Sequence, residues 1–282
     1  MMRTPEEMFT LILDMAKREE NIRLVGMNGS RANPNAPKDQ FQDFDIVYVV
    51  RDMKPFLENR EWIHYFGELV ILQTPEEMTL FPPSLNGWFT FLMQFADGNR
   101  IDLMLIPLSD MQKYLRSDSQ TMILLDKDHV AGSIPSPSDK KYWVKKPSEQ
   151  VYMDCCNEFW WLVLYVDKGI RRKELLYASA HLKNGIWNEL LRMLMWKAGT
   201  VHGFIFSPGK EYKYIKQYIS SEEWERLCLI MNTGSIELCM RALEIAIRLF
   251  SDVSKIVAEK LDFFYPDYEE KVLKYRQKLG EA

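Results

Sequence analysis

Two short stretches decide the fold: MNGSR at residues 27–31 and DFDIVYVV at residues 43–50. The first follows on from residues 22–27, which are mostly apolar and predict a β-strand. The second is rich in β-branched and aromatic residues, which also favour a strand. The segment between them, residues 33–42, is polar and contains proline, as is typical of a loop. The sequence therefore predicts two strands joined by a loop, with a Gly-Ser turn after the first and an Asp-x-Asp motif opening the second.

The Asp-x-Asp motif places two acids side by side. Residues two apart on a strand share a face, so Asp43 and Asp45 should project together. Two like charges held this close repel each other unless water or a cation compensates them. Mg²⁺ prefers oxygen ligands and commonly accompanies nucleotide phosphates. The pair therefore indicates a divalent metal site, and an exposed acidic pair at a strand start is the alternative.

The Gly-Ser-Arg turn suits a phosphate group. Gly29 lets the backbone approach an anion closely, and turn amides with the Ser30 hydroxyl can hold phosphate oxygens. Arg31 adds a guanidinium that can form two parallel hydrogen bonds to a phosphate. A Gly-Ser pair alone carries little information. Its position after a strand and a dozen residues before Asp-x-Asp favours a nucleotide site.

A third acid, Asp102, stands within the apolar run at residues 101–106. The turn at residues 97–99, Asp-Gly-Asn, predicts a hairpin between strands at residues 88–95 and 100–108. A charged residue in such a strand is rarely buried unpaired. Asp102 is therefore either an edge residue or a third metal ligand beside Asp43 and Asp45. In the second case it can also take the proton from an attacking hydroxyl.

The rest of the chain predicts an α+β protein. Residues 1–134 alternate helical and strand patterns, residues 135–148 are rich in proline, serine and lysine, and residues 149–282 are helical by period. We expect an N-terminal catalytic domain, a linker and a C-terminal helical bundle that binds substrate. Helices are predicted at residues 151–167, 173–198, 221–231 and 235–261, and a further strand at residues 122–125.

Composition excludes several classes of protein. The 282 residues include 36 Lys and Arg against 40 Asp and Glu, a formal net charge of -4, which argues against broad nucleic-acid binding. No run of about 18 apolar residues occurs, so we expect no membrane span. The four cysteines form no C-x-x-C pair and are expected to be reduced thiols in a cytoplasmic protein. The sequence sets no oligomeric state, and a monomer is compatible with it.

These motifs resemble the polymerase-beta-like nucleotidyltransferase superfamily, and the whole chain resembles its aminoglycoside 6-adenylyltransferases. The strings FQDFDIVY at residues 41–48, KGIRRKELLYA at residues 168–178 and FFYP at residues 263–266 carry the closer resemblance. It implies a mixed sheet with flanking helices in the N-terminal domain. It also implies ATP as co-substrate, Mg²⁺ as metal and adenylylation of a streptomycin-like aminoglycoside. It implies that Asp43, Asp45 and Asp102 are metal ligands.

The same resemblance makes Gly29, Ser30 and Arg31 contacts of the triphosphate. Lys168 could also reach the triphosphate, although a cation near a helix end is favoured by the helix dipole in any case.

The predicted acceptor is cationic, so its site should contain acids and aromatic faces. Asp154, Glu158 and Trp161 recur at i, i+4 and i+7 on one predicted helix, which places them on one stripe. We expect this stripe to bind the substrate. The outer, polar face of an amphipathic helix is the alternative.

Other functions remain compatible with parts of the pattern. The same chemistry could act on a lincosamide, a protein hydroxyl or an RNA end, although an RNA end would want a basic groove. A non-catalytic relative should have lost one of the three acids, and all three are present. A hydrolase could use the same acids, but this function would not explain the Gly-Ser-Arg turn.

Overall fold

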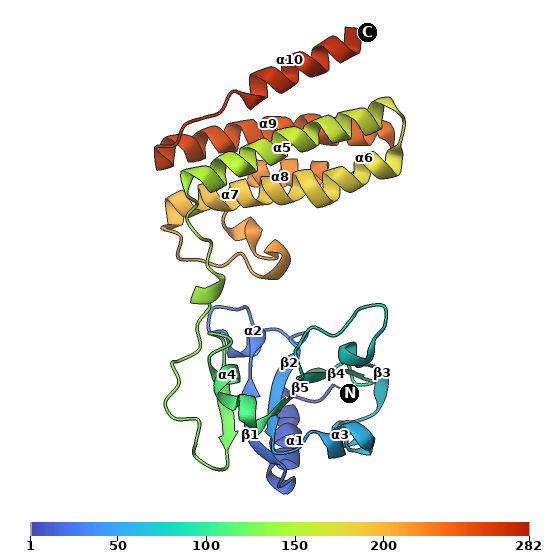
Figure 1. The fold of residues 1–282 in the computed structure, drawn as a ribbon, viewed down its shortest axis with the longest axis vertical. Helices are drawn as coiled ribbons and strands as arrows, with labels where there is room; N and C mark the ends of the chain where they lie inside the picture. The colour runs from blue at the N-terminus through green and yellow to red at the C-terminus, as the bar shows by residue number, and fades with distance from the viewer. Residues whose placement is uncertain (1, 282) are drawn as a thin grey trace. The chain divides into compact units, whose positions relative to one another are not determined.

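A computed structural model describes residues 2–281 and divides the chain into two compact units, Met1–Lys141 and Tyr142–Ala282 (Figure 1). The division falls within the proline-rich segment at residues 135–148. Among the described residues, no helix combines the length and apolar character that crossing a membrane requires.

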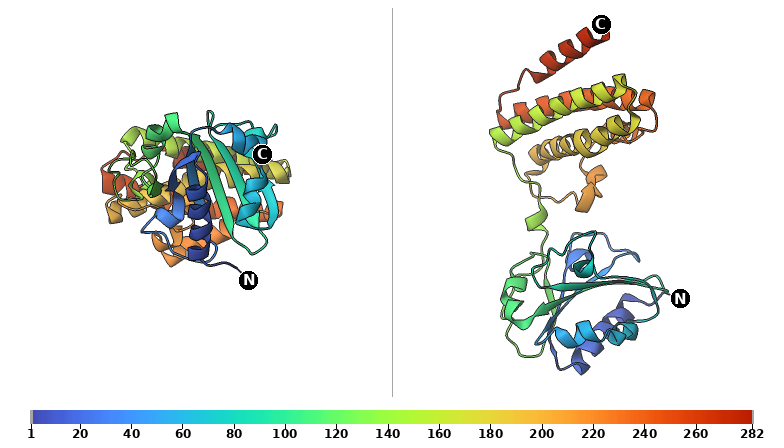
Figure 2. Two further views of the ribbon diagram at one scale, coloured as in Figure 1. Left: turned by 90° about the horizontal axis from the view of Figure 1, so that it is seen from below. Right: turned by 45° about the vertical axis from the view of Figure 1, so that its right-hand side comes forward.

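The first unit is a six-stranded mixed sheet with short helices on both faces (Figure 2). The strand order is β3-β4-β5-β2-β1-β6, in which only the β2–β5 pair is parallel. The strands are β1 (Ile22–Met27), β2 (Phe44–Val50), β3 (Leu69–Gln73), β4 (Phe89–Phe95), β5 (Arg100–Pro107) and β6 (Met122–Asp126). The helices are α1 (Pro5–Arg18), α2 (Gly29–Ala32), α3 (Lys54–Glu58) and α4 (Met111–Leu115), with a 3₁₀ helix at Glu61–Phe66.

Alternating residues of β2 pack into two different cores. Phe44, Ile46 and Tyr48 join the large cluster that includes residues of α1 and α3. Val47 and Val49 join a smaller cluster with Met111, Tyr114 and Leu115 of α4. Since side chains on a strand alternate between faces, Asp45 lies on the α4 side of the sheet. Asp102 on β5 lies on the same side, because its neighbours Ile101 and Leu103 face the large cluster.

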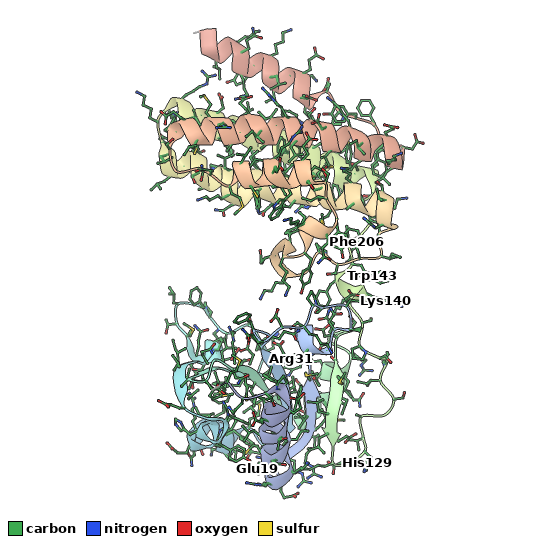
Figure 3. All side chains as sticks on the ribbon, turned by 180° about the vertical axis from the view of Figure 1, so that it is seen from behind. Glu19, Arg31, His129, Lys140, Trp143 and Phe206 are labelled. Atoms are coloured by element: carbon green, nitrogen blue, oxygen red, sulfur yellow. The ribbon has the colours of Figure 1, made fainter. Side chains whose placement is uncertain are left out.

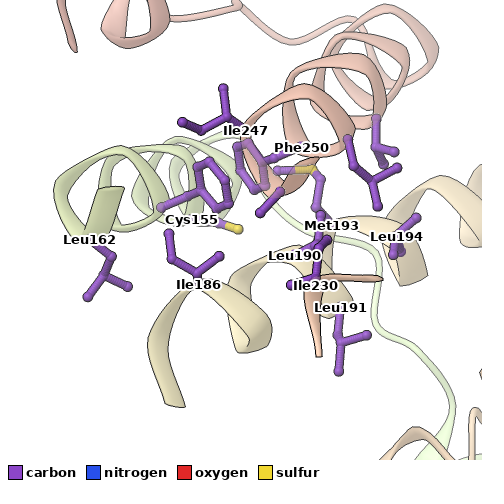
Figure 4. Packing of buried hydrophobic residues seen from close by; sticks show 14 of the residues in the cluster. Cys155, Leu162, Ile186, Leu190, Leu191, Met193, Leu194, Ile230, Ile247 and Phe250 are labelled. Atoms are coloured by element: carbon purple, nitrogen blue, oxygen red, sulfur yellow. The ribbon is translucent and has the colours of Figure 1, made fainter. Parts of the chain in front are cut away.

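The second unit is a helical bundle, as predicted. Its helices are α5 (Glu149–Arg171), α6 (Leu175–His181), α7 (Trp187–His202), α8 (Ser221–Ile230), α9 (Ile236–Leu261) and α10 (Tyr268–Glu281). Figure 4 shows its core, where Phe250 of α9 meets Cys155 of α5 and Leu190 of α7. Phe159 stacks on Phe250 with ring centroids 3.7 Å apart. Serine side chains cap α5, α8 and α9 at their first turns, which fixes where these helices begin.

The structure corrects the prediction in several places. The helix expected at residues 173–198 is present as one continuous helical stretch at residues 175–202, which begins two residues later than predicted because Lys173 has a left-handed φ of 58°. A π-helical turn at Leu182–Ile186 lies inside it, between α6 and α7. The predicted Gly-Ser-Arg turn is a single helical turn, α2. The sequence analysis missed β3, an edge strand, and α10, whose mostly charged sequence weakens the apolar period.

Candidate active site

Gly29 brings the Gly-Ser turn against the Asp-x-Asp motif. Its φ is +69°, in the region that favours glycine, and it begins α2 directly after β1. A Cβ built on Gly29 would lie 2.0 Å from Asp45 Oδ2. The backbone amide of Asn28 donates to the carbonyl of Asp45 at 2.9 Å. The turn and the acid are therefore neighbours that only glycine allows.

Asn28 fixes this neighbourhood from the other side. The Tyr114 hydroxyl donates to Asn28 Oδ1 at 2.7 Å, and Asn28 Nδ2 donates to Thr121 Oγ1 at 3.0 Å. Burial raises the pKa of Tyr114, so this hydroxyl stays protonated and remains a donor. The network connects α4 and the start of β6 to the turn that precedes α2.

Arg31 has its guanidinium directed at the backbone before β2. Its Nε donates to the carbonyl of Asp43 at 3.0 Å, and its Nη2 donates to the carbonyl of Gln42 at 2.6 Å. The guanidinium also lies 3.8 Å from the centroid of the Phe44 ring. Burial lowers the pKa of Arg31 while the charge of Asp43 opposes that effect. Arg31, labelled in Figure 3, therefore holds the strand start in place, and the structure does not test its predicted phosphate contact.

Arg100, a basic side chain that the sequence analysis did not single out, forms ion pairs with two of the three predicted acids, Asp43 and Asp102. Asp45 and Asp102 are register partners on the parallel strands β2 and β5. Arg100 Nε donates to Asp102 Oδ1 at 2.7 Å, and its Nη2 donates to Asp102 Oδ2 at 2.9 Å. The same Nε lies 3.8 Å from Asp43 Oδ2. The hydrogen bond to Asp102 is the main cause of the raised pKa of Arg100, and Asp43 and Asp45 add to it.

The donor chemistry of these acids suits Mg²⁺, since carboxylate oxygens are its preferred protein ligands. Their present arrangement does not. Within residues 2–281 no group of three acidic, imidazole or thiol side chains is placed to hold a metal ion. Both oxygens of Asp102 accept hydrogen bonds from Arg100. The guanidinium of Arg100 therefore supplies the positive charge beside this carboxylate.

The helical unit has its own pocket of about 720 Å³. Two of the predicted substrate residues, Asp154 and Glu158, line it. Glu189 of α7 adds a third acid, and Trp196 of the same helix adds an aromatic face. Three bases complete the charged lining: Lys145, Lys146 and Arg192. The pocket therefore presents both signs of charge, with acids on two adjoining helices.

Glu189 is the buried acid of this pocket. Only 10% of its side chain is exposed, and it pairs with Arg192, whose side chain is 46% exposed. The Cys155 thiol lines the same pocket and contacts the carbonyl of Glu189 at 3.7 Å. Burial, with the charge of Glu189, raises the pKa of Cys155 far above its ordinary value. This thiol is therefore a packing group, and it is not a nucleophile.

The other two predicted residues of the helical unit lie outside the pocket. Trp161 is 54% exposed and contacts the ring of Tyr165 edge-on. Lys168 is exposed in the last turn of α5, and it follows Glu158 by ten residues, about 15 Å along a helix. Asp154, Glu158 and Trp161 share a stripe in sequence, but only Asp154 and Glu158 line the pocket.

Two residues in these sites carried weak sequence signals. Arg100 directly follows the predicted hairpin turn and stands two residues before Asp102, so both share a face of β5. Glu189 repeats an acid beside an aromatic residue on the second helix. Neither pattern shows which partner the side chain contacts. The contact depends on how the elements pack and on which rotamer the side chain adopts.

Known proteins are similar to this chain over nearly its whole length. The family model described as streptomycin adenylyltransferase matches residues 2–279. An aminoglycoside 6-adenylyltransferase of Campylobacter jejuni is 44% identical over 279 residues, which is 98% of this chain and 96% of the relative. One from Bacillus subtilis is 42% identical over 277 residues, 98% of each chain. A crystal structure of an aminoglycoside 6-adenyltransferase from Bacillus subtilis superimposes with a TM-score of 0.50 at 38% identity, covering all of both chains.

The fold and these relatives define the class: the protein is an enzyme, a nucleotidyltransferase. More narrowly, the chain belongs to the streptomycin adenylyltransferase family.

Proposed function

We propose that this enzyme transfers AMP from ATP to a hydroxyl of a streptomycin-like aminoglycoside and thereby inactivates the antibiotic. The observation that carries the proposal is the family membership together with a full-length match to relatives named for that activity. The free thiols of Cys155, Cys156 and Cys239, all buried, are compatible with a reducing cytoplasm, where ATP is available.

The catalytic half of the proposal rests on the acids of the sheet. In the transfer, the acceptor oxygen attacks the α-phosphorus of ATP, pyrophosphate leaves, and the hydroxyl proton passes to a base. Asp102 is our candidate base, and Arg100 donates one hydrogen bond to each of its two oxygens, which leaves lone pairs that can accept that proton. Asp43, Asp45 and Asp102 would hold Mg²⁺, which supplies charge neutralisation to the triphosphate. Gly29, Ser30 and Arg31 are the proposed phosphate contacts, and Lys168 is a further one.

The acceptor half rests on the pocket of the helical unit. Asp154, Glu158 and Glu189 offer carboxylates to ammonium or guanidinium groups, and Trp196 offers a ring face. Glu189 already pairs with the guanidinium of Arg192, so a cationic partner suits this carboxylate. Trp161 lies on the same stripe of α5 as Asp154 and Glu158 but outside the pocket, and we propose it as a contact at the edge of the bound substrate.

A transfer assay tests the proposal. Purified enzyme is incubated with ATP labelled at the α-phosphate, Mg²⁺ and one acceptor at a time: streptomycin, spectinomycin, kanamycin, a lincosamide or tRNA. We expect label on streptomycin alone, and none with Asp45→Asn. Label on the lincosamide or tRNA would show that the enzyme transfers AMP but that its acceptor is not an aminoglycoside. No label on any acceptor, with a folded protein, would contradict the proposed transferase reaction.

A further inference from the structure

The position of Arg100 at the acidic centre has a consequence for metal binding. Both oxygens of Asp102 are engaged by the guanidinium, and a bidentate guanidinium takes two of the lone pairs that a metal ion could use. The guanidinium is also a positive charge at the place where a divalent cation would bind, and like charges repel. Arg100 and a divalent cation therefore compete for Asp102.

Arg100 is able to leave this position. Its side chain is 39% exposed, and it belongs to the first residue of β5, directly after the hairpin turn. An ion pair that is open to solvent contributes little stability, so breaking it costs little. Asp102, with 20% of its side chain exposed, would then be left with charged acids on its own face of the sheet and would need another cation.

We propose that Arg100 is an internal counter-cation that holds Asp102 until a divalent ion replaces it, and that Arg100 thereby sets the metal affinity of the site. The inference rests on the proposed placement of the metal at Asp43, Asp45 and Asp102. Arg100 is a positioning residue here, since it acts through Asp102.

Metal affinity measured without nucleotide tests this directly. Mn²⁺ binding to the full chain is followed by electron paramagnetic resonance at constant ionic strength, for the wild type and Arg100→Gln. The variant keeps a polar side chain and removes the charge. We expect Mn²⁺ to bind roughly tenfold more tightly, because one competing cation is lost and one net negative charge is gained. The rise in melting temperature on adding Mn²⁺ should also be larger than in the wild type.

Arg60→Gln is the matched control. Arg60 also forms a two-bond ion pair, with Glu77, and it lies against the Phe89 and Phe91 rings of the sheet. The substitution removes the same charge and the same kind of pair away from the acids. It should leave Mn²⁺ affinity unchanged. A similar gain in both variants would mean that net charge alone is responsible, and the inference would be overturned.

The remaining outcomes separate this inference from the proposed metal site. Wild-type or weaker Mn²⁺ binding by Arg100→Gln would overturn the role of Arg100, provided that Asp45→Asn abolishes binding. Unchanged Mn²⁺ binding in Asp43→Asn and Asp45→Asn would instead remove the metal from these acids, and the inference would fall with it. Binding by the variant alone, with none in the wild type, would support the inference.

Discussion

Single side chains decide how closely the Gly-Ser turn approaches Asp45. A Cβ on Gly29 would collide with Asp45, and the positive φ of Gly29 disfavours any side chain. Gly29→Ala should therefore lower AMP transfer by a factor of roughly 100 or more, since small misplacements at a reacting centre are costly. Gly132→Ala is the control, because Gly132 has a φ of +67° and its Cβ would meet nothing within 4 Å. Equal rates for both variants would show that the close approach is unimportant.

Asp102 is the side chain for which the proposed role is chemical. Asp102→Asn removes the base and a negative charge, so kcat should fall roughly 100-fold or more while the KM for ATP changes less. Steady-state kinetics with labelled ATP measure both. A variant with wild-type kcat would reassign Asp102 to a structural pair with Arg100.

Glu158 is a proposed contact of the acceptor, and its substitution tests whether the pocket of the helical unit binds that acceptor. Glu158→Gln should raise the KM for the aminoglycoside roughly tenfold, because a charge-assisted hydrogen bond becomes a neutral one, and the KM for ATP should change little. Glu225→Gln, at an exposed position of α8, is the matched control and should change neither. Equal changes in both KM values would place Glu158 outside the acceptor site.

At the scale of elements, the hairpin of β4 and β5 is anchored at its turn. Arg3 Nε donates to Asp97 Oδ2 at 2.6 Å, and Asn99 donates to Asp97 from its backbone and side chain. The bond from Arg3 is the main reason why the pKa of Asp97 lies well below its ordinary value. This connection ties the segment before α1 to the hairpin that carries Arg100 and Asp102.

The sign of the resulting pH dependence follows from that lowered pKa. A carboxyl with a depressed pKa in the folded state stabilises the fold above its unfolded pKa of about 4, and this stabilisation is lost as the pH falls further. Asp97→Asn should lower the free energy of unfolding by about 1 kcal/mol at pH 7, a value kept small by solvent screening. Urea titrations should show the difference shrinking below about pH 4. Asp14→Asn, which removes a carboxylate from an exposed pair with Lys17, is the matched control for the loss of one charge.

Elements also show where sequence patterns succeed. The strands β1 and β2 and the helix α9 have strong periodic patterns, and they lie within a residue or two of their predicted bounds. The π-helical turn between α6 and α7 was not predicted, because the apolar period continues across it. A π-helical turn and a left-handed Lys173 change the backbone without changing the composition. The apolar pattern indicates which face of a helix is buried, and it does not predict such local irregularities of the backbone.

At the scale of the whole molecule, the chain consists of two units with separate cores. The clusters of the first unit use residues up to 134, and the cluster of the second begins at Val144. Each unit has the size of an independent domain. Residues 142–282 expressed alone should therefore unfold cooperatively when helical circular dichroism is followed on heating. A non-cooperative melt would show that the helical unit depends on the first unit for its fold.

Sequence patterns alone predict the fold class, the helical second unit and the candidate acids, because strand period, turn residues and local charge are properties of neighbouring residues. What those acids contact follows from tertiary packing. Arg100 meets Asp43 because β5 lies parallel to β2, although the two residues are far apart in the chain. Glu189 lines the pocket of the helical unit because α7 packs beside α5. Such contacts depend on how elements pack, which no local pattern encodes.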